Sequence, residues 1–237
     1  MKLKQRVVSR LTSWACWPFV GAVTGIENVP PSGPCILVPN HLSVFDGPLL
    51  CSIMNLRSRH AHFVSYKYSF DHPFTGFFLK VNEGIVLDES SSEGKAAALR
   101  ECRRMLDEGR VVGLFPEAHT APFEAMRKAK SGVALLALQT GAPVMPVGLL
   151  NTHRVVPREG DLPGPRWKAA EVRFGQPLDL TPYVERFSKA ERRESLDIVA
   201  GVSTIIMRSI AALSGQEYRH GVRAYEKLMA AVGSEAR

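Results

Sequence analysis

The chain has 237 residues, a mass of 26.1 kDa, 45% hydrophobic residues and 22% charged residues. This composition excludes a disordered chain and indicates one domain, or one domain with a short appendage. The net charge is +7, but Lys2, Lys4, Arg6 and Arg10 place +4 of it in residues 1–26, which contain no acid. A basic stripe across the fold, typical of nucleic-acid-binding proteins, is therefore not indicated.

A basic start followed by an apolar run marks residues 1–26 as a separate N-terminal segment. Residues 11–26 are uncharged, but this run is shorter than the roughly 20 apolar residues of a spanning helix. An apolar stripe on a helical wheel consists of Leu3, Val7, Leu11 and Trp14. We expect an amphipathic helix that associates with a lipid surface, making the protein peripheral to the cytoplasmic face of a membrane. A helix packed on the protein's own core and a cleaved signal peptide are the alternatives.

After a proline-rich loop at residues 30–34, short apolar runs alternate with helical patterns. The predicted strands are residues 35–38, 62–65, 84–87, 111–115, 144–149 and 171–174. The predicted helices are residues 47–55, 74–80, 94–108, 130–140, 188–213 and 222–232, with Gly109 and Gly141 as C-terminal caps. This alternation predicts an α/β fold over residues 27–237, with a mostly parallel central sheet flanked by helices and further helices at the C-terminus.

Cysteine and histidine spacing gives no metal motif. The four cysteines contain no C-x-x-C pair, which excludes a zinc ribbon or a thioredoxin-like motif, and we expect buried free thiols. His60 and His62 share one strand face, but no third ligand stands nearby in the sequence, so we expect no metal.

The first candidate for chemistry is the stretch Asn40-His41-Leu42-Ser43-Val44-Phe45-Asp46, directly after the predicted strand 35–38. A spacing of five places His41 and Asp46 on different faces of a regular helix, so they meet only if the segment is a strand-to-helix turn. A carboxylate beside an imidazole fixes its tautomer and stabilises its protonated form, which is general-base chemistry. The alternative is a histidine in a polar turn and an aspartate that only caps a helix.

Two further candidates follow along the chain. Glu117 comes just after Pro116 ends a predicted strand, at the end of the sheet where α/β proteins bind ligands. Arg127 and Lys130 stand at the start of a predicted helix, where cations oppose the helix dipole, so anion binding is one reason for their presence. An ordinary loop acid and a solvated charge run are the alternatives.

Together these motifs resemble the glycerolipid acyltransferase family, whose best-known members are the 1-acylglycerol-3-phosphate acyltransferases. The resemblance covers residues 33–175, about 60% of the chain. It rests on Asn-His-x4-Asp at residues 40–46, Phe-Pro-Glu at 115–117, Lys-x-Gly at 130–132 and Met-Pro-Val-Gly at 145–148. A short block at residues 84–88 also matches the family in spacing.

The resemblance implies transfer of a fatty acyl group from acyl-CoA or acyl carrier protein to a lysolipid hydroxyl in phospholipid biosynthesis, without a cofactor. It implies that His41 is the general base and that Asp46 orients it. It also implies acceptor binding and donor or acyl-chain contacts. The acceptor-binding candidates are Glu117, Lys130, Arg127, Asn40 and Ser43, and the candidates for the acyl donor or acyl chain are Pro146, Phe74 and Phe77.

Two departures from the family pattern concern the acceptor. Thr120 and Glu89 stand where family members that bind a phosphate-bearing acceptor usually carry arginine, and a threonine cannot make a bidentate contact with phosphate. Arg127, Lys128 and Lys130 are possible substitutes. We therefore expect 1-acylglycerol-3-phosphate as the acceptor, with a different or phosphorus-free lysolipid as the alternative, and a non-catalytic lipid-binding homologue as the alternative outside the enzymes.

Overall fold

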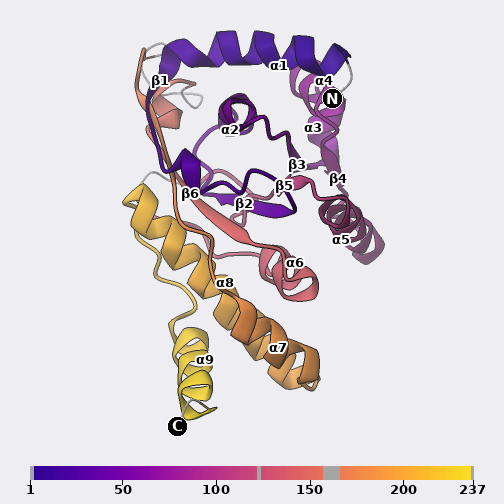
Figure 1. Cartoon of the computed structure of the whole chain (residues 1–237), viewed down its shortest axis with the longest axis vertical. Helices are drawn as coiled ribbons and strands as arrows, with labels where there is room; N and C mark the ends of the chain where they lie inside the picture. The colour runs from indigo at the N-terminus through magenta and orange to yellow at the C-terminus, as the bar shows by residue number, and fades with distance from the viewer. Residues whose placement is uncertain (1–2, 122–123, 157–165, 236–237) are drawn as a thin grey trace.

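The computed structural model describes residues 3–121, 124–156 and 166–235, and shows a central sheet with helices on both faces (Figure 1). The strands are β1 (Val20–Thr24), β2 (Cys35–Pro39), β3 (Ala61–Tyr66), β4 (Ile85–Leu87), β5 (Val111–Gly113), β6 (Val144–Leu150) and β7 (Ala170–Phe174). The α-helices are α1 (Leu3–Cys16), α2 (Asp46–Met54), α3 (Lys67–Asp71), α4 (Pro73–Val81), α5 (Ser92–Asp107), α6 (Gly132–Thr140), α7 (Thr181–Lys189), α8 (Arg192–Ser214) and α9 (Val222–Glu235). Four 3-10 turns complete the described elements, η1 (Trp17–Phe19), η2 (Ile26–Asn28), η3 (Asn55–Arg57) and η4 (Thr152–Arg154).

The sheet has seven strands in the order β1-β7-β6-β2-β5-β3-β4, and every neighbouring pair is parallel except β6 and β7. This confirms the predicted α/β fold with a mostly parallel sheet. The neighbouring strands β2 and β5 pair in parallel, with Leu37 opposite Gly113. The loops that follow them therefore leave from the same edge of the sheet, which brings residues 40–46 and 115–121 together.

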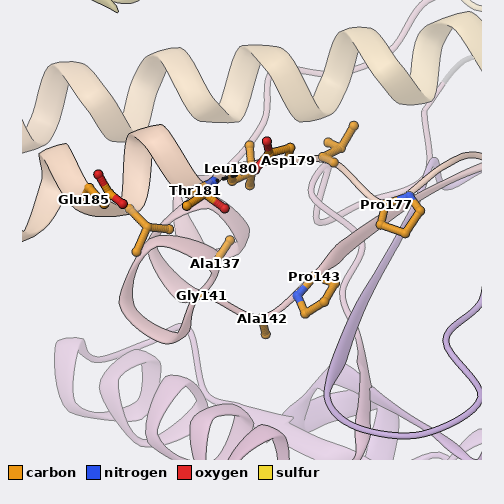
Figure 2. A pocket seen from close by; sticks show the side chains of 11 residues that line it. Ala137, Gly141, Ala142, Pro143, Pro177, Asp179, Leu180, Thr181 and Glu185 are labelled. Atoms are coloured by element: carbon orange, nitrogen blue, oxygen red, sulfur yellow. Dashed lines mark hydrogen bonds between the residues drawn. The ribbon is translucent and has the colours of Figure 1, made fainter.

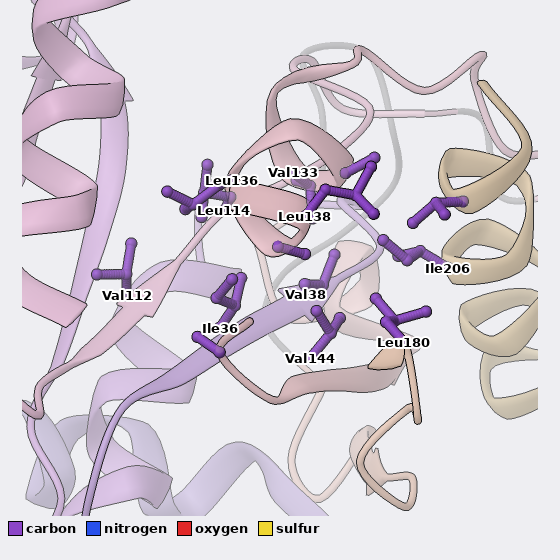
Figure 3. Close-up of a cluster of buried hydrophobic side chains, with 14 of the residues drawn as sticks. Ile36, Val38, Val112, Leu114, Val133, Leu136, Leu138, Val144, Leu180 and Ile206 are labelled. Atoms are coloured by element: carbon purple, nitrogen blue, oxygen red, sulfur yellow. The ribbon is translucent and has the colours of Figure 1, made fainter. Parts of the chain in front are cut away.

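Side chains along the central strands alternate between two cores, as the pleat of a sheet covered on both faces requires. Ile36 and Val38 of β2 point into a core formed with α5, α6 and α8 (Figure 3). Cys35 and Leu37 of the same strand point into the opposite core, which includes Leu49, Leu50 and Ile53 of α2 and Cys16 of α1. Each strand is thus fixed in register, because a shift of one residue would exchange the two faces.

Helix α8 is the one helix in the described residues that is long and apolar enough to cross a membrane by length and composition. Its side chains Ile198, Val202, Ile206 and Ile210 are buried, and the helix packs against β6, α6 and α9. This burial is that of a core helix. Glycine residues at φ +73° and +64° end the preceding helices α5 and α6 at Gly109 and Gly141, as expected.

The N-terminal segment differs from the prediction after residue 16. Helix α1 runs across one end of the molecule and packs over α2, which joins it to the rest of the fold (Figure 1). Residues 20–24 form strand β1, which pairs with β7 at the edge of the sheet. The sequence did not predict this strand because it is short and only partly buried, within a continuous uncharged run.

Candidate active site

Asp46 builds the turn between β2 and α2 that holds the imidazole of His41. It is fully buried in the first turn of α2, where a carboxylate is favoured by the helix dipole. Its Oδ2 atom lies 2.8 Å from Nδ1 of His41 and accepts the backbone N–H groups of Leu42 at 2.7 Å and Ser43 at 2.9 Å. The strand-to-helix turn therefore brings together a histidine and an aspartate that a regular helix would separate.

The ring of His41 is held on a second side by aromatic stacking. Its centroid lies 4.1 Å from that of Phe115, which stacks in turn on Phe63 at 5.5 Å. Gly113 leaves room for this arrangement, because a Cβ atom there would lie 2.4 Å from the Phe63 ring. The His41 side chain keeps 18% of its surface exposed, while Asp46 has none. The imidazole is therefore fixed in orientation and still reachable.

Glu117 ties the two loops of the site together through backbone groups. Its Oε1 accepts the N–H of His41 at 3.0 Å and its Oε2 accepts the N–H of Arg127 at 2.7 Å. The carbonyl of His41 accepts the N–H of Ala121 at 2.7 Å, so the same loop holds His41 from both sides. Glu117 is 2% exposed, and burial raises the pKa of its carboxyl above the usual range, partly opposed by these two N–H donors.

The basic candidates lie at the rim of this site. Nε of Arg127 donates to the carbonyl of Thr120 at 3.0 Å, which places the guanidinium beside the residue that replaces an expected arginine. The backbone N–H of Lys130 donates to the carbonyl of Pro116 at 2.9 Å. Both side chains are exposed. The structure thus brings both bases to the loop that carries Glu117.

Asn40 and Ser43, predicted as acceptor-binding residues, instead face the protein's own interior. Asn40 is fully buried and its amide exchanges hydrogen bonds with the backbone of Leu149 at 2.9 and 2.6 Å. Ser43 is 4% exposed, and its hydroxyl donates to the Val156 carbonyl and accepts the Phe45 N–H. Both side chains shape the loop around His41 through these bonds, and their assignment to acceptor binding stays a prediction.

The candidates for the acyl donor or acyl chain lie on β6 and on α4. Pro146 is buried within β6, opposite Val38, and its ring packs near Gly175. Phe77 is 61% exposed on α4, a helix that packs against α1. The side chain of Phe74 lies outside the described residues. The assignment of Pro146, Phe74 and Phe77 to the acyl donor or acyl chain therefore stays a prediction.

Two contacts of the site follow from no local sequence pattern. Phe115 is the first residue of the Phe-Pro-Glu motif, but nothing in that motif indicates that its ring stacks on His41. Gln216 accepts a hydrogen bond of 2.7 Å from Asn40 Nδ2 across 176 residues of sequence. No local pattern marks such a long-range pairing.

One cavity lies where β3 and β4 end, and another lies where β6 begins. One of about 280 Å³ lies near the site, and its lining residues are Tyr66, Lys67, Tyr68, Asp71, Leu87, Asp88, Glu89 and Ser90. The other, of about 430 Å³, lies where β6 begins, among residues of α6 and α7 such as Ala137 and Glu185, and none of the candidate site residues lines it (Figure 2).

Within the described ranges, no group of three or more His, Cys, Asp or Glu side chains is arranged to hold a metal ion.

Comparison with known proteins fits this geometry. The family model described as "Acyltransferase" matches residues 21–150, more than half of the chain. A 1-acyl-sn-glycerol-3-phosphate acyltransferase of Chlamydomonas reinhardtii is 30% identical over 66% of this chain and 47% of its own length. The protein of that name from Borreliella burgdorferi is 31% identical over 55% of this chain and 51% of its own length. The chain thus spans about half the length of the curated relatives it matches.

A solved structure shares the fold. The crystal structure of the 1-acyl-sn-glycerophosphate (LPA) acyltransferase PlsC from Thermotoga maritima aligns with a TM-score of 0.61 and 24% identity, over 89% of this chain and 78% of that one. The matched range of the family model, residues 21–150, contains both loops that meet at His41. By the family match and the shared fold, this chain belongs to the acyltransferase family.

Proposed function

We propose that this chain transfers a fatty acyl group from a thioester of CoA or acyl carrier protein to the hydroxyl of a lysolipid, with 1-acylglycerol-3-phosphate as the acceptor. The contact between His41 Nδ1 and Asp46 Oδ2 at 2.8 Å carries this proposal. It leaves Nε2 as the nitrogen that takes a proton, as a general base requires. The names of the relatives support the acceptor, and the family match supports acyl transfer.

The reaction needs no covalent enzyme intermediate, because the thioester is already activated. Nε2 of His41 takes the proton of the acceptor hydroxyl while the hydroxyl oxygen attacks the thioester carbonyl. The tetrahedral intermediate collapses by breaking its C–S bond, and the imidazolium returns the proton to the leaving thiolate. General-base catalysis of this kind contributes about 10²–10⁴-fold, and Asp46 stabilises the imidazolium throughout.

Arg127 is the residue that we propose to bind the acceptor phosphate, with Lys130 beside it. Its backbone is anchored by Glu117 and its guanidinium lies at Thr120, so its position is fixed by the same loop that holds His41. A guanidinium binds phosphate through two parallel N–H donors, which the threonine cannot supply.

A panel of acceptors tests this proposal with labelled acyl-CoA and purified protein. We expect lysophosphatidic acid to be acylated, and Arg127→Ala to raise its KM about tenfold or more, the cost of losing a charge-assisted pair. Lys95→Ala is the matched control, because Lys95 is an exposed base on α5, outside the loops of the site. Equal KM values for Arg127→Ala and the wild type would reject the phosphate site, and release of free fatty acid without any acceptor would indicate a hydrolase.

A second acceptor class is favoured by the 280 Å³ cavity near the site. Asp71, Asp88 and Glu89 line it against a single base, Lys67, which pairs with Asp88 at 3.9 Å. The ring of Tyr66 in this cavity stacks on His119, two residues after Glu117, at 5.1 Å. Excess negative charge suits an ammonium headgroup better than a phosphate monoester. Preferential acylation of an amine-bearing, phosphorus-free lysolipid in the same panel, lost in Glu89→Gln, would favour this class.

We also propose that the protein works at a membrane surface, on the cytoplasmic face, where anionic lipids attract basic segments. Helix α1 exposes Val7, Leu11 and Trp14 at fractions of 50%, 61% and 80%, on one side of the helix. Trp17 continues this surface, and the exposed Trp167 stacks on the adjoining Phe19 at 5.2 Å. Tryptophan side chains suit the headgroup region of a bilayer, so this apolar surface supports peripheral association.

A further inference from the structure

The segment that follows α8 reaches the candidate active site from a part of the chain that the family model does not match, since that match ends at residue 150. Gln216 is 7% exposed, and its Oε1 accepts a hydrogen bond of 2.7 Å from Nδ2 of Asn40. Asn40 directly precedes His41 in the chain. We propose that Gln216 is a positioning residue for His41, a role that rests on the proposed function.

The amide of Asn40 is held in one orientation by three hydrogen bonds. One hydrogen of Nδ2 goes to Gln216 and the other to the Leu149 carbonyl at 2.9 Å, while Oδ1 accepts the Leu149 N–H at 2.6 Å. Strand β6 and the segment after α8 thus fix the loop at the residue before the general base. Without the Gln216 acceptor, one buried N–H of Asn40 loses its partner, which is costly in the interior and favours a shift of the loop.

The same segment also holds the loop that carries Arg127. The carbonyl of Glu217 accepts the N–H of Met126 at 3.0 Å, and the N–H of Glu217 donates to the Glu124 carbonyl at 3.3 Å. Residues 125 and 217 form a parallel β-bridge there. Arg127 is the next residue after Met126, and its N–H is one of the two that Glu117 accepts.

These contacts make the segment a shared support for both loops of the site. Gln216 acts on the loop of His41, and Glu217 acts on the loop of Arg127. Burial raises the pKa of the Tyr218 hydroxyl, partly opposed by a hydrogen bond with the backbone of Ala129, and the Glu117 carboxylate raises this pKa further. Because the contacts of Glu217 use backbone atoms, Gln216 is the position where a side-chain substitution tests the support.

Four variants separate positioning from general stability. Gln216→Leu removes the acceptor oxygen and keeps a similar side-chain volume. Gln216→Asn shortens the side chain by one carbon and so moves the oxygen away from Asn40. Gln216→Glu keeps an oxygen acceptor at the same side-chain length. Thr204→Val is the matched control. Thr204 is also buried, and its hydroxyl donates to the carbonyl of Gly221, a residue that also follows α8, at 3.3 Å. The measurements are kcat and KM with labelled acyl-CoA and lysophosphatidic acid, the urea midpoint, and the His41 tautomer by ¹⁵N NMR.

We expect Gln216→Leu and Gln216→Asn to lower kcat by about 10²-fold with KM unchanged, the effect of a misplaced catalytic group. We expect Gln216→Glu to recover most of kcat, and Thr204→Val to lower the urea midpoint without lowering kcat. In the NMR spectrum we expect the wild type to show only the Nδ1–H tautomer of His41, and Gln216→Leu a mixture.

Unchanged kcat in Gln216→Leu and Gln216→Asn, or an equal fall in Thr204→Val, would overturn the positioning role. If the wild type acylates no lysolipid, the proposed function fails, and the NMR comparison then decides the positioning role by itself. An identical single tautomer in the wild type and in both Gln216→Leu and Gln216→Asn would contradict it. If Gln216→Leu does not fold, the same comparisons are made with Gln216→Asn.

Discussion

The rings of His41 and Phe115 stack with centroids 4.1 Å apart and planes inclined by 27°. This contact joins the loop after β2 to the loop after β5, next to the hydrogen bond that Glu117 accepts from the His41 backbone. The imidazole is therefore held by Asp46 at its edge and by Phe115 on its face. Both restraints limit the ring to one orientation, which general-base catalysis requires.

Phe115→Leu tests the stacking restraint. We expect kcat to fall about tenfold or more, because the imidazole gains rotational freedom that misaligns proton transfer. The loss of a partly buried ring should also lower the free energy of unfolding by about 1 kcal/mol. Steady-state kinetics and urea unfolding measure the two effects. An unchanged kcat with reduced stability would mean that Phe115 contributes packing alone.

Glu117→Gln tests the two backbone bonds that join the loops. A carboxylate accepts both N–H groups, whereas a glutamine presents one oxygen and one NH₂ group, so one of the two bonds is lost. We expect kcat to fall and KM for the acceptor to rise, because the His41 loop and the Arg127 loop separate. The control is Glu171→Gln, an acid paired with Arg173 outside the site, at 3.0 Å. Wild-type kinetics in Glu117→Gln would contradict this account of the loops.

Trp14→Glu tests membrane association through α1. Burying a large apolar side chain is worth about 1.5–3 kcal/mol, so its replacement by a charge should weaken liposome binding about tenfold or more. Flotation with anionic liposomes measures the bound fraction. Leu196→Glu is the matched control, because Leu196 is 66% exposed on α8 rather than on α1. Equal loss of binding in both variants would indicate that α1 is not the contact surface.

The pair His60 and His62 predicts loss of stability in acid. Their rings lie 4.8 Å apart, and a ring nitrogen of each bonds the Asn82 carbonyl. Burial lowers the pKa of both histidines. The neighbouring His62 lowers the pKa of His60 further, and Arg110 does the same for His62. The unfolded chain then binds more protons than the folded one below the ordinary histidine pKa of about 6.5. The histidine contribution to stability is therefore complete above that pH and declines as the pH falls below it.

Urea unfolding at pH 8 and pH 5.5 measures this dependence. We expect the double variant His60→Gln, His62→Gln to lose less stability between the two values than the wild type. His220→Gln serves as the control, because His220 is exposed. Glu83 pairs with Arg110 at 3.1 Å beside the two histidines. Its negative charge favours the protonated form of His62, but the pKa of His62 remains lowered, so the predicted loss of stability in acid keeps its direction. The same slope in the wild type and the double variant would refute the prediction.

The sequence predicts the part of the fold that follows from local periodicity. A continuous apolar run such as residues 35–38 predicts a buried strand, and the structure places Ile36 and Leu37 in opposite cores. Strand β1 and the helices α3 and α7 were not predicted, because they are short and largely exposed. Their formation depends on neighbours in the fold rather than on their own pattern.

The candidate site likewise contains residues that the sequence identifies and contacts that it cannot indicate. His41, Asp46 and Glu117 were identified because their residue types and spacing carry chemistry, and the structure brings them together. The resemblance assigns Asn40 to the acceptor, and its hydrogen bonds inside the fold could not be predicted because its partners, Leu149 and Gln216, are distant in sequence. The hydrogen bond that Glu117 accepts from Arg127 uses a backbone N–H, which any residue except proline supplies, so no residue type could indicate it.

The single-turnover rate of His41→Gln tests the general base most directly. Wild type and variant are mixed in excess with labelled acyl-CoA and lysophosphatidic acid on liposomes, and the acylated product is counted over time. Glutamine cannot take the proton of the acceptor hydroxyl, so the rate should fall by about 10²–10⁴-fold while substrate binding and the urea midpoint stay unchanged. A variant that acylates the acceptor at the wild-type rate would contradict the assignment of His41 as the general base.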